Sequence, residues 1–269
     1  MTVVVAALTC IGVTAACGRA ASPVAGSSVG PAAVAPTSAQ LRVTPQVNSF
    51  ASAAQVEPDM RVGAIFLGGD SFHSCSASVL NSSTGDLILT AAHCLADGVE
   101  TTFVPGFRDT VDAPWRVDTV YLDPRWLATE DPQADFAVAR VSRDDGASVQ
   151  AAAGGGLALG MAPAPGITLT VTGYPMGTGG GPFGCQGTTA PAQDGFPALP
   201  CAGVTDGFSG APWIVGATVQ GVVGGLDGGG CDDDVSFSPR FDARTGRLLA
   251  RAEARGPGDA APVASAGDC

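Results

Sequence analysis

The chain has 269 residues, of which 45% are hydrophobic and 14% are charged. This length is enough for one large β-domain or two small ones, each with a sizeable core. The formal net charge is −12, and all 13 basic residues are arginine. This balance excludes a nucleic-acid partner, because binding to phosphates needs a basic surface that displaces their counterions.

The N-terminal segment Met1 to Cys17 contains an apolar run and no charge. It is too short to span a membrane but fits the apolar part of an export signal. Thr14-Ala15-Ala16-Cys17-Gly18 is similar to a bacterial lipoprotein cleavage box, in which the cysteine is lipidated. Cys17 is therefore a lipidation candidate that would tether the protein to the membrane, with simple secretion as the open alternative. Both routes predict an extracellular protein, secreted or lipid-anchored on the outer face of the membrane.

The rest of the chain divides into segments of different amino-acid composition. Residues 18–61 are rich in Ala, Ser, Pro, Val and Gly and predict a disordered linker or propeptide. In residues 62–252, short apolar runs alternate with turn residues, which predicts an all-β domain and leaves barrels and a sandwich open. The expected strands are 62–67, 78–80, 87–89, 115–122, 136–141, 167–173, 213–215 and 219–223. We expect a short helix at 247–255 and a flexible tail at 253–269.

Only two histidines are present, so histidine chemistry falls on His73 or His93. His93 lies in Thr90-Ala91-Ala92-His93-Cys94, directly after the expected strand 87–89. A satisfied core histidine is the ordinary reading of such a residue, but this string and its position favour a catalytic base.

Ser209 lies in Asp206-Gly207-Phe208-Ser209-Gly210-Ala211-Pro212, before an expected strand. Glycine at position 207 allows a tight turn that aims the backbone N–H groups of Gly207 and Ser209 at one point, as an oxyanion hole requires. A plain surface turn would explain this string alone. Its place after His93 favours a nucleophile.

Asp135 precedes the expected strand 136–141, where its carboxylate would be buried against an imidazole and fix the tautomer. Asp118, Asp123 and Asp131 are the alternatives. Asp118 alternates with apolar residues as a solvent-facing strand residue does, and the other two neighbour prolines in loop-like sequence. The need for a supported carboxylate favours Asp135.

In this chain order, these segments resemble the trypsin/chymotrypsin-like serine proteases, in particular a bacterial branch, over about residues 62–250. Three further stretches support the resemblance: 171–175, 199–203 and 235–238. The resemblance implies two antiparallel β-barrels with the active site in the cleft between them. It implies His93, Asp135 and Ser209 as catalytic triad, no cofactor, a protein or peptide substrate and a monomer.

The resemblance also implies two disulfides, Cys75–Cys94 and Cys185–Cys201, which leave Cys231 to pair with Cys269. His73 matches a family histidine with a structural hydrogen bond. Metal binding is disfavoured, because the sequence has no CxxC pair and neither histidine has a ligand-like neighbour.

The chain departs from the family pattern in the substrate cleft and beside the nucleophile. Phe208 stands where activatable trypsins have aspartate, which argues against their activation by a new N-terminus. Gly224-Gly225-Leu226 stands where the family often has Ser-Trp-Gly, and Gly203 or a neighbour falls near the base of the primary specificity pocket. Gly203, Gly224, Gly225 and Leu226 are the expected substrate-binding positions. Because trypsins carry aspartate at the base of the pocket, glycine there does not support cleavage after Arg or Lys.

These features predict a secreted serine endopeptidase that works through an acyl-enzyme. The alternative is a catalytically silent homologue that binds peptides or protein partners through the same cleft, which Phe208 and the Gly-Gly-Leu segment would favour. A serine esterase of the α/β-hydrolase fold is excluded by chain order, because its serine precedes its histidine.

Overall fold

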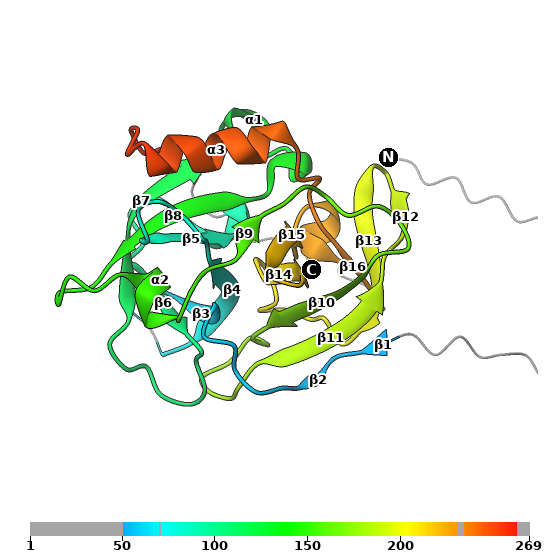
Figure 1. Cartoon of the computed structure of the whole chain (residues 1–269), viewed down its shortest axis with the longest axis horizontal. Helices are drawn as coiled ribbons and strands as arrows, with labels where there is room; N and C mark the ends of the chain where they lie inside the picture. Colours follow the sequence, from blue (N-terminus) through cyan, green and yellow to red (C-terminus); the bar gives the residue numbers. More distant parts are fainter. Residues whose placement is uncertain (1–50, 70, 231–233, 263–269) are drawn as a thin grey trace, which may run out of the picture. The chain divides into compact units, whose positions relative to one another are not determined.

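The computed structural model describes residues 51–69, 71–230 and 234–262. Within these residues, six strands form a closed antiparallel barrel in the order β3-β4-β5-β8-β7-β6 (Figure 1). They are β3 (Val62–Leu67), β4 (His73–Val79), β5 (Leu87–Thr90), β8 (Ala137–Ser142), β7 (Trp115–Leu122) and β6 (Thr101–Pro105). All six match or overlap expected strands except β6, whose run Thr101–Pro105 was not among them.

Strand β5 shows why these segments are continuously apolar. Its side chains point alternately to two faces, and both faces are covered. Leu87 and Leu89 pack with Leu248 of the C-terminal helix, while Ile88 packs with Trp115 inside the barrel. A strand buried on both faces has no polar alternation, so its sequence reads as an unbroken apolar run.

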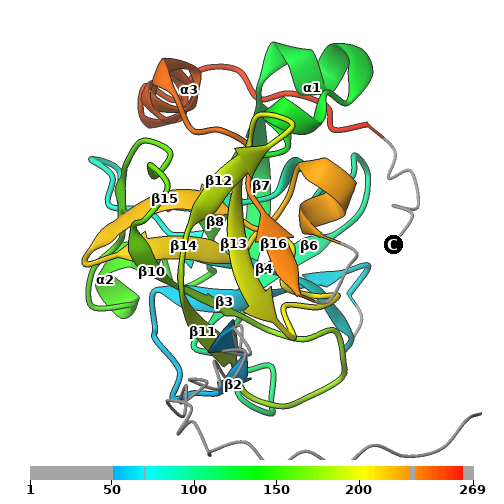
Figure 2. The same ribbon diagram turned by 90° about the vertical axis from the view of Figure 1, so that its right-hand side faces the viewer.

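The second half of the domain consists of two hydrogen-bonded sheets rather than one continuous ladder (Figure 2). One sheet has the order β1-β13-β12, with β16 also paired to β13. The other has the order β2-β11-β10-β14-β15-β9. The strands of the first are β1 (Ala51–Ser52), β13 (Phe196–Ala202), β12 (Ala190–Gln193) and β16 (Val235–Phe237). Those of the second are β2 (Ala54–Gln55), β11 (Phe183–Thr188), β10 (Thr168–Gly173), β14 (Pro212–Val215), β15 (Thr218–Val222) and β9 (Ala158–Leu159).

Helices are few and short. The described residues contain α1 (Pro124–Thr129), α2 (Val149–Ala152), α3 (Ala243–Glu253) and the 3-10 turns η1 (Ala92–Cys94), η2 (Pro132–Ala134) and η3 (Leu226–Gly229). The helix expected at 247–255 begins four residues earlier. The reason is a capping box, in which the Asp242 carboxylate accepts from the N–H of Arg244 and the Thr245 hydroxyl accepts from the N–H of Asp242.

Two expected boundaries differ from the structure. Strands β1 and β2 lie inside the segment expected to be a disordered linker, so the ordered fold starts by Ala51 rather than at 62. At the C-terminal end, the described part of the expected flexible tail, residues 253–262, makes contacts with the first barrel. The Asp259 carboxylate accepts from the N–H of Leu122 at 2.7 Å, and Ala261 is buried in the barrel core. Residues 1–50, which include Cys17, and residues 263–269 lie outside the described residues.

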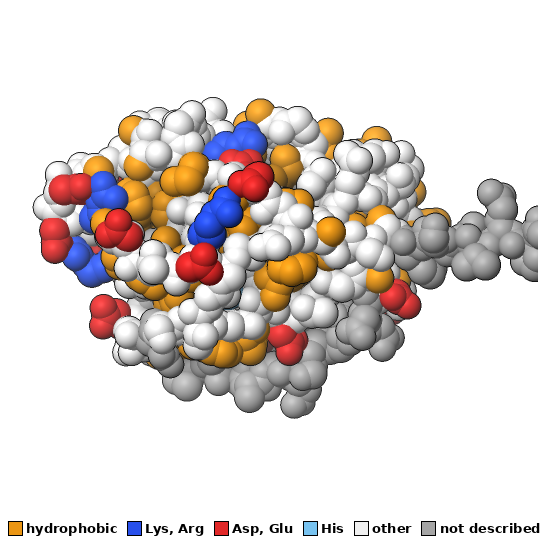
Figure 3. Space-filling model, turned by 90° about the horizontal axis from the view of Figure 1, so that it is seen from below, with side chains coloured by type: hydrophobic (Ala, Val, Ile, Leu, Met, Phe, Trp, Pro, Cys, Tyr) orange, Lys and Arg blue, Asp and Glu red, His pale blue; other side chains and the backbone are white. Residues whose placement is uncertain are grey.

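Charged side chains on the described surface are mostly paired. Arginines pair with nearby acids, as in Arg61–Asp59, Arg108–Glu57, Arg116–Asp144 and Arg143–Asp145. The face in Figure 3 shows blue side chains beside red ones and no continuous basic area among its described atoms. None of the described helices is long and apolar enough to cross a membrane.

Candidate active site

The pairing of β5 with β8 brings His93 and Asp135 to the same end of the barrel. Thr90, the last residue of β5, lies opposite Ala137, the first residue of β8, in antiparallel register. The chain beyond Thr90 and the chain before Ala137 therefore emerge at one edge. His93 sits there in η1, and Asp135 ends η2.

The two side chains form a direct hydrogen bond. His93 Nδ1 lies 2.8 Å from Asp135 Oδ2, and the backbone N–H of His93 donates to Asp135 Oδ1 at 3.0 Å. The Asp135 side chain is 2% exposed and that of His93 is 30% exposed. The carboxylate is thus buried behind an imidazole whose other edge is accessible.

The electrostatics follow from this arrangement. Burial lowers the pKa of the His93 imidazole, but the Asp135 carboxylate outweighs it, so the pKa lies above its ordinary value. Burial alone would raise the pKa of Asp135, yet the charge of His93 and the N–H donors hold it below its ordinary value. The pair is therefore built to keep Asp135 ionised beside an imidazolium.

Asp135 has a further donor that the sequence did not reveal. The backbone N–H of Gly225 donates to Asp135 Oδ2 at 2.8 Å. A Cβ added at Gly224 would lie 2.8 Å from the same oxygen, so a side chain there would crowd the carboxylate. The serine expected at this place from the family pattern is absent, and a backbone amide one residue later supplies a hydrogen bond in its stead.

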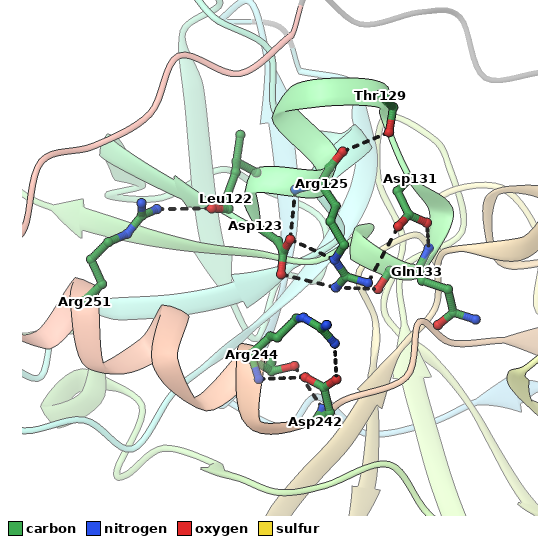
Figure 4. A network of polar contacts seen from close by, with 10 residues as sticks. Leu122, Asp123, Arg125, Thr129, Asp131, Gln133, Asp242, Arg244 and Arg251 are labelled. Atoms are coloured by element: carbon green, nitrogen blue, oxygen red, sulfur yellow. Dashed lines mark hydrogen bonds and ion pairs between the residues drawn. The ribbon is translucent and has the colours of Figure 1, made fainter.

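The alternative acids have structural roles. Asp123 caps α1 by accepting from the N–H of Arg125, and Asp131 caps η2 (Figure 4). The Arg125 guanidinium joins the two, donating to Asp123 at 2.9 Å and lying 3.6 Å from Asp131. Asp118 is exposed on β7. Asp123 and Asp131, which were alternatives to Asp135, therefore stabilise the loop that leads to it.

Ser209 lies in the loop between β13 and β14 and is fastened to the first barrel through Ser76 of β4. The N–H of Ser76 donates to the carbonyl of Ser209, and the Ser76 hydroxyl donates to the carbonyl of Gly207, both at 2.8 Å. That hydroxyl also accepts from the N–H of Tyr174 at 2.9 Å. Ser76 is fully buried. No sequence signal distinguished this residue from the other serines of 74–78.

Gly207 and Phe208 fix the shape of the loop in different ways. Gly207 has φ +91°, and a Cβ there would lie 2.2 Å from the backbone nitrogen of Met176, so a larger residue would force the backbone to move. Phe208 is fully buried and packs with Val171 and Trp213 in the core of the second half. Apolar packing therefore holds the loop at the residue where activatable trypsins have an aspartate.

Two backbone N–H groups of this loop are unused. Among the hydrogen bonds of the described residues, none involves the N–H of Gly207 or of Ser209. Both residues line the same pocket as His93. The Ser209 hydroxyl likewise makes no hydrogen bond with His93 among the described residues, although both face this pocket.

The pocket has a volume of about 500 Å³ and contains His93, Asp135, Gly207 and Ser209 in its lining. Of the four expected substrate-binding residues, Gly225 lines it, whereas Gly203, Gly224 and Leu226 do not. Gly203 faces Ala53, and Leu226 packs with Phe196 and Phe237 instead. Other lining residues were not expected from the sequence, and they include Trp126, Glu130, Pro132, Met176, Val204, Gly228, Gly229 and Gly230. The position of residues 126–132 just before Asp135 was the available signal.

His73 packs away from this pocket. Its ring meets Phe66, Phe107 and Tyr174 edge to face, and Nε2 lies 3.4 Å from the carbonyl oxygen of Gly179. Burial lowers the pKa of His73, so it stays neutral near neutral pH. This agrees with the expected structural role.

Both disulfides expected within the described residues are present, Cys75–Cys94 and Cys185–Cys201. Cys231 and Cys269 lie outside the described residues. Cys75, His93 and Cys94 bring their ligand atoms within 4.8 Å of one another. The two sulfurs are bonded to each other and His93 Nδ1 faces Asp135, so this group offers no free thiolate pair for a metal.

Removing the two disulfides one at a time tests whether Cys75–Cys94 holds the segment that carries His93. The two bridges close segments of similar separation, 19 and 16 residues, so serine pairs at either site should lose about 3 kcal/mol of unfolding free energy, within about 0.2 kcal/mol of each other by chain entropy. Urea unfolding measures this loss. Cys94 directly follows His93, so loss of the Cys75–Cys94 bridge should also speed amide hydrogen exchange in the peptide that covers 91–95, whereas loss of Cys185–Cys201 should not. Equal exchange of this peptide in both variants would contradict this.

Comparisons with known proteins show the family and the fold of the chain. Residues 75–226 match the trypsin-like peptidase domain family. The fold is similar to the protease Anisep from Arthrobacter nicotinovorans (TM-score 0.65, 23% identity, 75% of this chain and 99% of that chain). It is similar to the thermostable serine protease AL20 from an extremophilic microorganism (TM-score 0.63, 23% identity, 73% of this chain and 98% of that chain). It is also similar to human heparin binding protein (TM-score 0.59, 16% identity, 77% of this chain and 99% of that chain). No curated protein sequence matches the chain. With a chymotrypsin-like fold and a family match over more than half of its length, the chain belongs to the trypsin-like peptidases.

Proposed function

We propose that the chain is an extracellular serine endopeptidase with His93, Asp135 and Ser209 as its catalytic triad. The observation that carries the proposal is the buried Asp135 carboxylate bonded to His93 Nδ1, with His93 and Ser209 lining one pocket. An accessible imidazole held by a buried carboxylate beside a serine is the arrangement that acyl transfer needs.

Each residue then has a defined role. Ser209 Oγ attacks the carbonyl carbon of the scissile bond while His93 Nε2 takes its proton. The N–H groups of Gly207 and Ser209 donate to the oxyanion of the tetrahedral intermediate. His93 then protonates the leaving amine, and Asp135 stabilises the imidazolium. In the second half, His93 takes a proton from water while the water oxygen attacks the acyl carbon, and it then returns the proton to Ser209 Oγ as the carboxylic acid leaves. These steps need no cofactor.

Labelling with a fluorophosphonate probe tests the proposal, since the probe reacts with a serine only where base and oxyanion hole are assembled. The wild-type protein should label, and Ser209→Ala and His93→Ala should not. A folded wild-type protein with both described disulfides that fails to label would overturn the proposal. It would favour the silent homologue, in which the cleft binds peptides without cleaving them.

The pH dependence of labelling follows from the raised pKa of His93. The base must be neutral to accept a proton, so the rate should rise with pH through the pKa of His93 and fall at lower pH. Because Asp135 raises that pKa, the midpoint of the acid limb should lie above about 6.5, the ordinary value for histidine. Labelling rates between pH 5 and 9 measure the midpoint. A midpoint below the ordinary value would contradict the electrostatic role of Asp135.

We also propose that the protein acts outside the cell on protein or peptide substrates. The two disulfides of the described residues are of a kind that forms and persists in oxidising compartments. Removal of Met1 to Cys17 by a signal peptidase, or lipidation of Cys17, remains the expected route. The mass of the mature N-terminal peptide decides between them, because a lipidated Cys17 carries its acyl chains.

A further inference from the structure

The segment Ala51–Val56 holds together the two sheets of the second half of the domain. Strand β1 adds in parallel to β13, with Ala51 opposite Cys201. Strand β2 adds to β11 of the other sheet, with Ala54 opposite Gly184 (Figures 1 and 2). Ala53 alone separates the two strands, so these residues pair with both sheets in one short run.

Hydrogen bonds fasten the segment beyond the two ladders. The N–H of Ala53 donates to the carbonyl of Ala202 at 2.8 Å, and the N–H of Val56 donates to that of Pro182 at 3.0 Å. The Cys185–Cys201 disulfide links the same two strands, β11 and β13, that the segment joins. The segment therefore reinforces a junction that the fold already closes covalently.

The segment also lies beneath the loop that carries Ser209. Strand β13 ends at Ala202, and the next residues, Gly203 to Ser209, form that loop. A Cβ at Gly203 would lie 3.6 Å from the Cβ of Ala53. Ala51 and Ala53 pack against the core cluster that contains Val204 and Phe208. The start of the loop therefore lies next to the segment, and Phe208, its apolar anchor, belongs to the core cluster against which the segment packs.

We propose that Ala51–Val56 is an N-terminal strap that positions the Ser209 loop, and that it stays attached in the mature protein. This rests on the proposed function only in taking Ser209 as the nucleophile. The strap adds no catalytic group. It sets where β13 ends, and thereby where the N–H groups of Gly207 and Ser209 lie. Processing of the chain must then occur before Ala51, within the segment expected to be a linker.

Two neighbouring alanines offer a matched test. Ala53 is partly buried and packs against the core cluster, whereas Ala54 is exposed and pairs through its backbone. Ala53→Asp directs a charge at apolar residues, while Ala54→Asp places the same charge in solvent. Amide hydrogen exchange in peptides covering 201–210 should be about tenfold faster or more in the first variant and unchanged in the second.

Fluorophosphonate labelling of folded protein gives the second readout. It should slow about tenfold in Ala53→Asp and stay within about twofold of wild type in Ala54→Asp. Lower stability with unchanged exchange in 201–210 and unchanged labelling would show a merely structural strap and overturn the proposal. If Ala53→Asp does not fold, the pair Ala53→Asn and Ala54→Asn gives the same comparison with a smaller loss of stability, because an uncharged amide is easier to bury.

The mature N-terminus provides an independent check. Sequencing of the labelled, secreted protein should place it at or before Ala51. A labelled form that begins after Val56 would overturn the strap. If the wild-type protein does not label, the proposed function fails, and the exchange comparison still decides whether the strap orders the loop.

Discussion

Replacing Asp135 by asparagine should lower kcat by about 10⁴-fold while the protein stays folded. In the wild-type protein, the backbone N–H groups of His93 and Gly225 and the His93 ring all donate to the Asp135 carboxylate. The NH₂ group of an asparagine side chain cannot accept, so it would face either the backbone N–H groups or the ring. A ring that accepts at Nδ1 carries its proton on Nε2, where it cannot take the proton of Ser209. The pKa of His93 should also fall, because the charge that raises it is gone.

Asp118→Asn is the matched control for this variant. It removes the same charge from an exposed position on β7, so labelling should stay within about twofold of wild type. Labelling rates measured against pH separate the two effects of Asp135→Asn, since a tautomer change lowers the plateau and a lost charge moves the acid limb. A plateau within tenfold of wild type would remove Asp135 from the proposed triad.

The residues of the proposed triad and oxyanion hole could be selected from the sequence because each lies in a restricted local pattern. His93 and Asp135 each flank an apolar strand, and antiparallel pairing of those strands places them together. Gly207 was identifiable because its turn has no room for a side chain. These are constraints that a few neighbouring residues express, so one sequence reveals them.

The contacts that join the first barrel to the second half of the domain have no local sequence pattern. Ser76 touches Gly207, Ser209 and Tyr174, which are about 100 residues or more away in sequence, and nothing around Ser76 marks it. Gly225 donates through its backbone, so its residue type carries no signal. Strands β1 and β2 have two residues each and lie in an Ala-rich stretch, too short for a period-2 pattern. Long-range pairing, not local preference, orders these segments.

Phe208 is the residue that bears most directly on whether the protein is an active peptidase or a catalytically silent homologue. Phe208→Ala should lower the unfolding free energy by about 3–5 kcal/mol, because it leaves a cavity in a packed core. That is a large part of the about 5–15 kcal/mol that stabilises a typical domain. Urea unfolding measures the loss. In the fraction that remains folded, labelling should also slow, since Phe208 lies between the two N–H groups of the proposed oxyanion hole.

Phe208→Leu keeps an apolar side chain at the site and separates anchoring from simple volume loss. It should retain most of the stability and label at close to the wild-type rate, whereas Phe208→Asp buries an unpaired carboxylate against Val171 and Trp213 and should not fold. Gly173 explains why phenylalanine fits, since a Cβ there would lie 2.7 Å from the Phe208 ring. Labelling in Phe208→Ala at the wild-type rate would mean that the loop keeps its shape without this anchor. The bonds from Ser76 to Gly207 and Ser209 would then be sufficient to position it.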